Sequence, residues 1–207
     1  MSKALSATVV ENYLKTIYAH TEWQDQAITS SQLSARLGLA PSTVTEMVKK
    51  LVAQDLVLHE PYGAVVLTEI GRAQAVTIVR RHRLIETWLV VQFGYSWDEV
   101  HDEAEVLEHV MSDRLLGAID VQLGHPTHDP HGDPIPAADG EVRVPDAVLL
   151  DGVEGVTAGR IVRISDRDPE VLRELQSRSI SVGSDVSADD IPEALRSSIW
   201  IATPPVP

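Results

Sequence analysis

A tight turn between two helical segments is the strongest constraint on the fold. Thr29 stands three residues before Gln32, a capping-box pattern that predicts the start of a helix. That helix should end at Gly38, because glycine readily adopts the left-handed conformation that follows a helix. Pro41 suits the first position of a new helix, which we expect to reach about residue 54. One helix must therefore end and another begin within a few residues.

The flanking segments complete a recognisable order of elements. Apolar residues at helical spacing predict a helix over residues 7–23. Two short apolar runs, at 56–58 and 64–67, enclose Pro61-Tyr62-Gly63, which favours a β-hairpin. Three helices followed by a hairpin predict a winged helix-turn-helix. A helical bundle with an unrelated hairpin is the plainer alternative.

A winged helix-turn-helix places the N-terminal part of its second motif helix against base edges in the major groove. Hydroxyl and carboxylate groups there can read bases, and lysines one turn later can contact phosphates. The predicted hairpin would form the wing. The expected DNA-contacting residues are Ser42, Thr43, Thr45, Glu46, Lys49 and Lys50, with Tyr62 near the tip of the wing.

Charge limits where nucleic acid could bind. The chain has 17 Lys and Arg against 31 Asp and Glu, a net charge of −14, which by itself argues against a nucleic-acid partner. Residues 1–75 hold 6 basic against 7 acidic residues, so the excess of acid lies behind them. A phosphate-binding face is therefore expected only in the first third, and it should be small.

Composition excludes other classes of protein. With 43% hydrophobic residues the chain is globular, and no run approaches the roughly 18 apolar residues of a membrane span. Its start does not resemble a secretory signal. The absence of cysteine excludes disulfides, thiolate metal sites and cysteine nucleophiles, and fits a cytoplasmic protein.

The rest of the chain divides in character. Thr68, Ser96 and Ser112 are expected to cap helices reaching about residues 93, 111 and 123. A proline-containing stretch follows, and then short β-type runs at 142–144, 148–150, 159–164, 180–182 and 199–201, interrupted by a short helix near 169–177. We expect a mainly α protein with a small β part: a DNA-binding domain (1–72), a second helical domain (73–125), a linker (126–140) and a β-barrel-like domain (141–207).

Acids and histidines recur at helical spacing in the second of these domains. Glu105, Glu108 and His109 lie at i, i+3 and i+4, which puts them on one helical face. His82 and Glu86 form another i, i+4 pair. Carboxylate and imidazole donors without thiolate suit divalent manganese or ferrous iron. A solvated acidic face is the alternative.

A further group of histidines and acids lies in the expected linker. Histidines at every third position look like a metal-binding tract, although hydrogen bonding within a proline-rich turn explains them as well. The group comprises His125, His128, Asp129, His131 and Asp133.

Several motifs together resemble the diphtheria-toxin-repressor family of metal-dependent regulators, in its manganese-regulator-like branch. They are Arg81-His82-Arg83-Leu84, His101-Asp102-Glu103-Ala104, Glu108-His109-Val110-Met111-Ser112, His131-Gly132-Asp133-Pro134-Ile135-Pro136 and Pro41-Ser42-Thr43-Val44-Thr45-Glu46-Met47-Val48. The resemblance implies a homodimeric repressor with a C-terminal SH3-like β-barrel. Such a protein binds double-stranded operator DNA when loaded with Mn²⁺ or Fe²⁺, and it is not an enzyme.

The resemblance also implies a primary metal site built from Asn12, Glu105, Glu108 and His109. Glu105 stands where the iron branch has a cysteine, so a hard oxygen replaces a soft sulfur and manganese is favoured over iron. Asn12 departs from the manganese branch because its amide contributes no charge. Lys15 stands where binuclear regulators have a glutamate, which disfavours a close metal pair.

An ancillary site is implied as well, with one acid and one glutamine supplied by the C-terminal domain. Val171 stands at the glutamine position, and the linker histidines fall in a stretch that resembles a structural part of the family pattern. The ancillary residues implied are His82, Glu86 and His101, with Asp168 as the acid and Glu170 as its near alternative.

Three alternatives stay open at this point. The first is an iron-dependent repressor of the same family. The second is a metallohydrolase that uses the Glu/His cluster to activate water, although the chain has no helical HExxH and no glycine-rich phosphate loop. The third is a helix-turn-helix regulator that senses something other than metal.

Overall fold

The computed structural model describes residues 7–24, 26–60, 63–151 and 158–202. The chain divides into two compact units, the first made of Met1–Arg80 with Ala138–Gly140 and the second of Arg81–Ala137 with Glu141–Pro207. The units divide between Arg80 and Arg81, whereas the sequence predicts four segments with a first boundary at residue 72. Among the described residues no helix combines the length and apolar character that crossing a bilayer requires.

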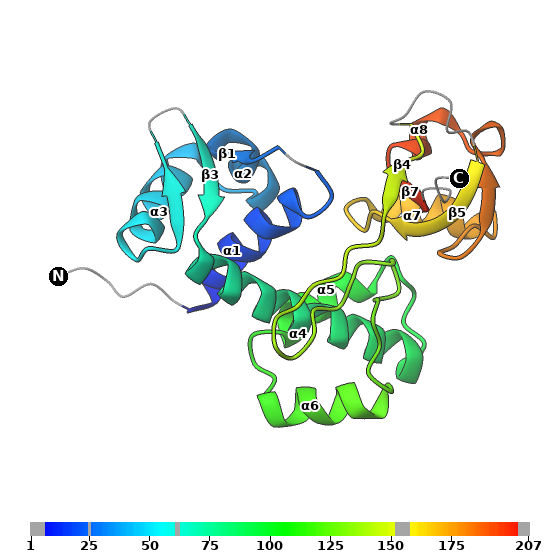
Figure 1. Ribbon diagram of the computed structural model, residues 1–207, viewed down its shortest axis with the longest axis horizontal. Coiled ribbons are helices and arrows are strands. Elements are labelled where there is room, and N and C mark those ends of the chain that lie inside the picture. The colour runs from blue at the N-terminus through cyan, green and yellow to red at the C-terminus, as the bar shows by residue number, and fades with distance from the viewer. Residues whose placement is uncertain (1–6, 25, 61–62, 152–157, 203–207) are drawn as a thin grey trace. The chain divides into compact units, whose positions relative to one another are not determined.

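The first unit contains the expected winged helix-turn-helix (Figure 1). Thr29 Oγ1 accepts from the Gln32 N–H at 3.2 Å and Gln32 Oε1 accepts from the Thr29 N–H at 2.9 Å, so the predicted capping box is formed. Gly38 has φ of 63° and Pro41 occupies the first turn of the next helix. The elements are α1 (Ala7–Thr21), β1 (Ile28–Thr29), α2 (Ser30–Leu37), α3 (Pro41–Ala53), β2 (Val57–His59) and β3 (Ala64–Leu67).

The wing has one strand more than the sequence predicts. β1 pairs antiparallel with β3, so the sheet has the order β1-β3-β2. β1 is two residues long, too short to leave an alternating pattern in the sequence. Ile28 nevertheless buries its side chain completely, and with Leu14, Leu33, Leu51 and Val65 it forms the core of this unit.

The long helix α4 (Glu69–Phe93) begins where expected. Thr68 Oγ1 accepts from the Gly71 N–H at 3.0 Å, which satisfies one of the free donors of the first turn. The backbone of α4 approaches the preceding chain closely here, because a Cβ atom on Gly71 would clash with the carbonyl oxygen of Leu56. Glycine at this position therefore permits the packing of the helix start.

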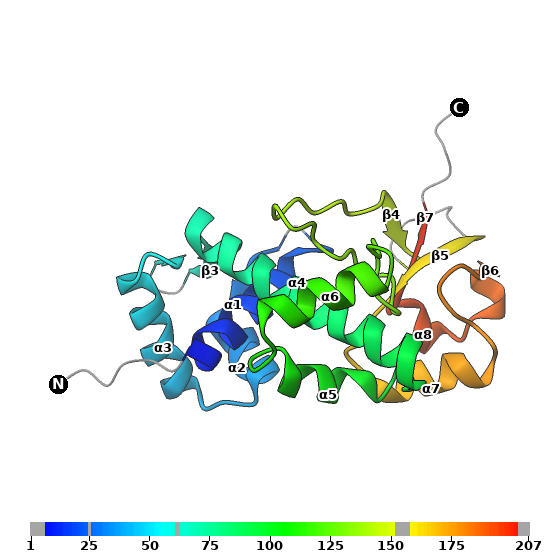
Figure 2. The same ribbon diagram turned by 90° about the horizontal axis from the view of Figure 1, so that it is seen from below.

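The second unit begins with the C-terminal half of α4, followed by α5 (Val100–Leu107) and α6 (Asp113–Gln122) (Figures 1 and 2). α5 is shorter than the predicted helix over 97–111, since Ser96 accepts from Glu99 and Val100 through its backbone and Glu108 to Val110 form a turn. Ser112 caps α6 as predicted, with its hydroxyl oxygen 3.3 Å from the Leu115 N–H.

Residues 131–136 are buried, in contrast to the solvated linker that the prolines predict. The Ile135 N–H donates to the Thr127 carbonyl, and a β-bridge joins His128 to Pro134. Burial is possible because polar side chains elsewhere in the unit form hydrogen bonds and ion pairs with the polar groups of this loop.

Within residues 141–151 and 158–202, the C-terminal part forms a four-stranded antiparallel sheet of order β4-β7-β5-β6 with helices beside it. The runs at 142–144 and 180–182, which the sequence predicts as strands, are not strands. Residues 142–144 have no regular secondary structure, whereas Ile180 and Val182 pack against the core from an irregular segment and the turn that follows it. The elements are β4 (Ala147–Leu149), β5 (Ala158–Ile164), α7 (Pro169–Ser177), β6 (Asp185–Ser187), the 3₁₀ turn η1 (Ala188–Asp190), α8 (Glu193–Arg196) and β7 (Ile199–Ala202).

Candidate metal centre

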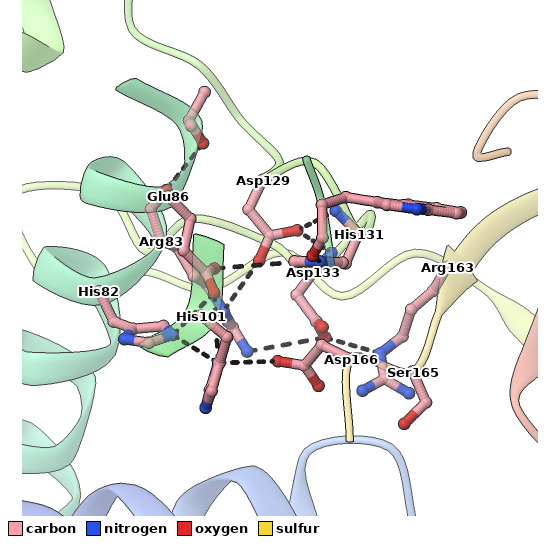
Figure 3. Close-up of polar contacts among 12 residues, drawn as sticks. His82, Arg83, Glu86, His101, Asp129, His131, Asp133, Arg163, Ser165 and Asp166 are labelled. Carbon is pink, nitrogen blue, oxygen red and sulfur yellow. Dashed lines mark hydrogen bonds and ion pairs between the residues drawn. The ribbon is translucent and has the colours of Figure 1, made fainter. Parts of the chain in front are cut away.

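Histidines and carboxylates converge at one place in the second unit (Figure 3). Successive turns of α4 present His82 and Glu86, and α5 presents His101. His82 Nε2 lies 2.9 Å from Glu86 Oε1, and His101 Nδ1 lies 3.3 Å from the same oxygen. Glu86 is 1% exposed, so this carboxylate depends on the imidazoles around it rather than on water.

Two further residues complete this cluster: His131, for which the sequence left a metal-binding tract and a hydrogen-bonded turn open, and Asp166, which the sequence did not single out. His131, in the buried loop after α6, has its Nδ1 atom 4.0 Å from Glu86 Oε2. Asp166, two residues beyond β5, has Oδ2 at 3.6 Å from His101 Nδ1 (Figure 3). Glu86, His131 and Asp166 can each direct one ligand atom to a common point, and so can His82, Glu86 and His101.

The acids expected from the C-terminal domain have other positions. Asp168 caps α7, where its Oδ1 accepts from the Glu170 N–H at 2.9 Å. Glu170 is exposed in the first turn of that helix, and Val171 packs against the C-terminal core. The sequence signal for Asp166 is its place shortly after the apolar run 159–164. Alignment backwards from residues 180–184 placed the expected acid two residues later, at Asp168.

Glu105, Glu108 and His109 lie together at the C-terminal end of α5. Glu108 is fully buried, and its Oε2 lies 2.6 Å from His82 Nδ1. His109 Nε2 lies 3.3 Å from Glu108 Oε1. His82, Glu105 and Glu108 form a third set able to direct ligand atoms to one point.

Asn12 lies on α1 of the first unit. Its side-chain oxygen is buried and has no hydrogen-bond partner among the described residues. A buried oxygen that accepts no hydrogen bond costs free energy unless another group satisfies it. This oxygen is therefore suited to ligate a cation.

The electrostatics of the cluster show how it is balanced without a cation. Burial acts to raise the pKa of Glu86, yet His82, His101 and His131 together hold it well below its usual range. Burial likewise opposes the charge on Asp166, but His131 and His101 lower its pKa. Burial acts to lower the pKa of His131, while Glu86, Asp129 and Asp166 raise it overall.

The imidazoles therefore stabilise the ionised carboxylates of Glu86, which is buried, and of Asp166, whose side chain is 24% exposed, and His131 in turn holds its proton more readily. A divalent cation can take over this role and displace the protons, because carboxylate oxygen and neutral imidazole are both ligands. His131 Nδ1 is buried and has no hydrogen-bond partner in the part of the chain that the structure describes, as expected for a nitrogen that has a ligand role. The donor set fits Mn²⁺ or Fe²⁺.

The residues expected to contact DNA lie on α3. Thr45 Oγ1 donates to its own helix at the Pro41 carbonyl, 2.9 Å away, and Lys49 Nζ lies 3.2 Å from Glu46 Oε1. An apolar groove beside them is lined by Val9 and Leu39, among others. Tyr62 lies outside the described residues. Those that the structure places on the exposed side of α3 are Ser42, Thr43, Thr45, Glu46, Lys49 and Lys50.

Two known family domains match most of the chain. Residues 6–65 match the domain described as "Iron dependent repressor, N-terminal DNA binding domain", and residues 68–137 match "Iron dependent repressor, metal binding and dimerisation domain". The boundary between the two matches falls at the start of α4.

Individual proteins of known name are similar to this chain as well. The iron-dependent repressor IdeR of Mycobacterium tuberculosis is 37% identical over 128 residues, 61% of this chain and 54% of IdeR, so the match spans about half of that relative. The diphtheria toxin repressor of Corynebacterium diphtheriae is 30% identical over 192 residues, covering 87% of this chain and 84% of the relative.

Solved structures resemble both units. A manganese-dependent transcriptional repressor in complex with manganese is 42% identical, with a TM-score of 0.86, and the match covers 94% of this chain and 99% of that one. The manganese regulator SloR is 30% identical, with a TM-score of 0.77, over 94% and 98% of the two chains.

Proposed function

Because this chain belongs to the iron-dependent repressor family, we propose that it is a metal-dependent transcriptional repressor that binds operator DNA as a homodimer. The observation that carries the proposal is the buried convergence of Glu86, Glu108 and their histidines in a chain whose first unit is a winged helix-turn-helix. A regulator of this kind acts on DNA in the cytoplasm and needs no catalytic group. Control of metal homeostasis is the corresponding role.

Manganese is the proposed cation rather than iron. The candidate ligands are oxygen and imidazole nitrogen, and the chain has no cysteine that could offer the softer sulfur. Two similar structures are described as manganese regulators, which supports the same choice.

Two ligand sets are proposed. The primary set comprises Asn12, Glu105, Glu108 and His109. The ancillary set keeps the predicted α4 and α5 residues but replaces Asp168 and Glu170, whose side chains lie elsewhere. It comprises His82, Glu86, His101, His131 and Asp166.

The mechanism follows from charge. The residues of the primary set, Asn12 on α1 with Glu105 and Glu108, would hold a divalent cation, which would offset the charge of the two carboxylates and restrain α1. Without it, Glu105 and Glu108 repel each other and α1 is free of that restraint. Ordering α1 in advance lowers the entropy that DNA binding costs. A coupling free energy of about 1–3 kcal/mol corresponds to about 5- to 150-fold control of operator affinity.

Substitution of the primary ligands tests the proposal. We expect Glu105→Ala and His109→Ala to abolish the manganese-stimulated part of operator binding while the protein stays folded and dimeric. Glu103→Ala is the matched control, since Glu103 is an exposed acid on the same helix. Mobility-shift titrations with manganese, zinc and anaerobic ferrous iron measure the effect. Metal dependence that is unchanged in both variants would reject this assignment.

A further inference from the structure

The loop that carries His131 is held by buried ion pairs from two other elements. Arg163 on β5 donates through Nε to Asp133 Oδ1 at 2.7 Å (Figure 3). Arg83 on α4 places a terminal nitrogen 3.6 Å from the same oxygen and donates to the Pro134 carbonyl at 2.7 Å. Both arginines and Asp133 are buried, so these contacts form away from water.

Contacts inside the loop transmit this restraint to His131. Asp129 Oδ1 accepts from the N–H groups of His131 and Asp133, at 2.8 and 2.9 Å. Gly132 has φ of 88°, and a Cβ atom there would clash with the carbonyl oxygen of Val162 on β5. The loop backbone thus lies directly against the strand, and its conformation there requires glycine.

His131 is held through its backbone and through one nitrogen of its ring. The Ile164 N–H donates to the His131 carbonyl at 2.9 Å, and His131 Nε2 lies 2.8 Å from the Trp97 carbonyl. With Nε2 serving as the donor to that oxygen, Nδ1 is left unprotonated in the neutral ring and faces Glu86. The ring orientation that suits a metal ligand is therefore set by the backbone around the loop.

β5 has two roles in this arrangement. It anchors the His131 loop through Arg163, and three residues later the chain supplies Asp166. Arg163 is itself held in place, because its guanidinium lies over the Trp200 ring of β7 at 4.2 Å. A buried ion pair contributes little net stability compared with apolar packing, but it is directional. Its presence here suggests a requirement for geometry.

We propose that Arg163 is a positioning residue of the metal centre: by holding Asp133, it keeps the His131 loop against β5 so that His131 and Asp166 reach Glu86 together. This inference rests on the proposed metal-binding function. The C-terminal sheet then acts as a structural part of the ancillary set, in addition to supplying one of its ligands.

The test is manganese binding to the full-length apo-protein, measured by electron paramagnetic resonance of free Mn²⁺. We expect Arg163→Met to weaken the class of sites that Asp166→Asn also weakens, by about 10- to 100-fold, as losses of outer contacts to metal ligands do. In Arg163→Met, the class of sites that Glu105→Ala weakens should keep its wild-type affinity for manganese. Arg143→Met is the matched control, since Arg143 is exposed and pairs with Glu141.

A spectroscopic readout separates positioning from general destabilisation. The Trp97 ring stacks on His131 with centroids 6.2 Å apart and an interplanar angle of 8°. In the wild type, manganese should change the tryptophan fluorescence, and the Trp97→Phe variant should lose most of this change. In Arg163→Met the change should need about 10- to 100-fold more manganese.

Asp133→Asn removes the charge of the carboxylate but nearly preserves the shape of the side chain. This variant tests the role of the ion pair if Arg163→Met does not fold. We expect a smaller loss in the same class of sites. Wild-type affinity in a folded Arg163→Met or Asp133→Asn protein, or an equal loss in both classes, would overturn the inference and leave the proposed function intact. Failure of the wild type to bind manganese at all would overturn both.

Discussion

At the scale of single residues, Glu86 is the carboxylate on which the candidate metal centre depends. Its carboxylate is buried, and an isolated buried carboxylate would take up a proton. His82 and His101 lie within 3.3 Å of it and His131 within 4.0 Å, so the charged form is retained. A side chain that is ionised, buried and surrounded by imidazoles offers what a divalent cation requires.

Two neighbouring aspartates give a matched test of the ancillary set. Asp166→Asn should weaken manganese binding to that set about tenfold or more, because an anionic ligand atom is replaced by an amide. Asp168→Asn should leave manganese affinity unchanged, since asparagine caps a helix about as well as aspartate. Isothermal titration of the apo-proteins measures both. The opposite ranking would return the role to Asp168.

Asp129 makes the stability of the metal-free protein depend on pH. Burial, with Asp133 and Glu86 adding to it, raises the pKa of Asp129 to about 8. Between about pH 5 and 8 the folded protein therefore keeps a proton that the unfolded chain has released. Its free energy of unfolding should fall as pH rises through this window, by up to about 1.4 kcal/mol per unit.

Asp129→Asn tests this expectation. Asparagine keeps an oxygen for the two loop N–H groups but cannot ionise, so the pH dependence should become shallower. Asp129 also helps to raise the pKa of His131, so the variant reduces the His131 contribution as well, and both changes make the slope shallower. Urea unfolding with chelator present at pH 5, 6.5 and 8 provides the measurement. Identical slopes would show that Asp129 is ionised throughout.

At the scale of elements, the C-terminal end of α5 places Glu108 of the proposed primary set. The helix ends at Leu107, and Glu108 at its C-cap carries a side chain that is fully buried beside His82. Val106 and Val110 on either side are exposed. Glu108 keeps helical backbone angles of −58° and −28°, so its side chain lies on the same buried face of the helix as Ala104.

The start of α4 and the middle of α6 provide contrasting glycines. Gly71→Ala should destabilise the protein by about 1–3 kcal/mol, because the new Cβ meets the Leu56 carbonyl, which is backbone and cannot move aside easily. Gly117→Ala should stabilise it by about 0.5–1 kcal/mol, because that position is helical, exposed and open. Urea denaturation of the two variants compares them. A neutral Gly71→Ala would mean that α4 shifts freely.

At the scale of the whole molecule, metal and DNA binding must influence each other equally. If manganese raises operator affinity by a given factor, operator DNA must raise manganese affinity by the same factor, since both are equilibria of one cycle. We expect that factor to lie within about 5- to 150-fold.

The reciprocity is measurable from both sides. Operator affinity is titrated with and without manganese, and manganese affinity is titrated with and without a saturating operator duplex. A duplex of scrambled sequence is the control for charge effects of DNA on the free cation. Factors that disagree beyond error would show that the two ligands do not act through one equilibrium.

Much of the local structure follows from short-range signals. The capping box at Thr29, the left-handed turn at Gly38 and the cap at Ser112 each involve residues three or four apart, so the sequence displays them directly. The same holds for the spacing of Glu105, Glu108 and His109. Such patterns determined the DNA-binding fold and one helical face of acids.

Long-range packing decided the rest. His131 and Asp166 reach Glu86 from 45 and 80 positions further along the chain, and a spacing pattern cannot encode contacts at that separation. β1 exists only because β3 offers it a partner. The loop around His131 has the composition of a linker, yet Arg83 and Arg163 bury it. Local chemistry thus specified which groups could bind a cation, and tertiary packing selected those that meet.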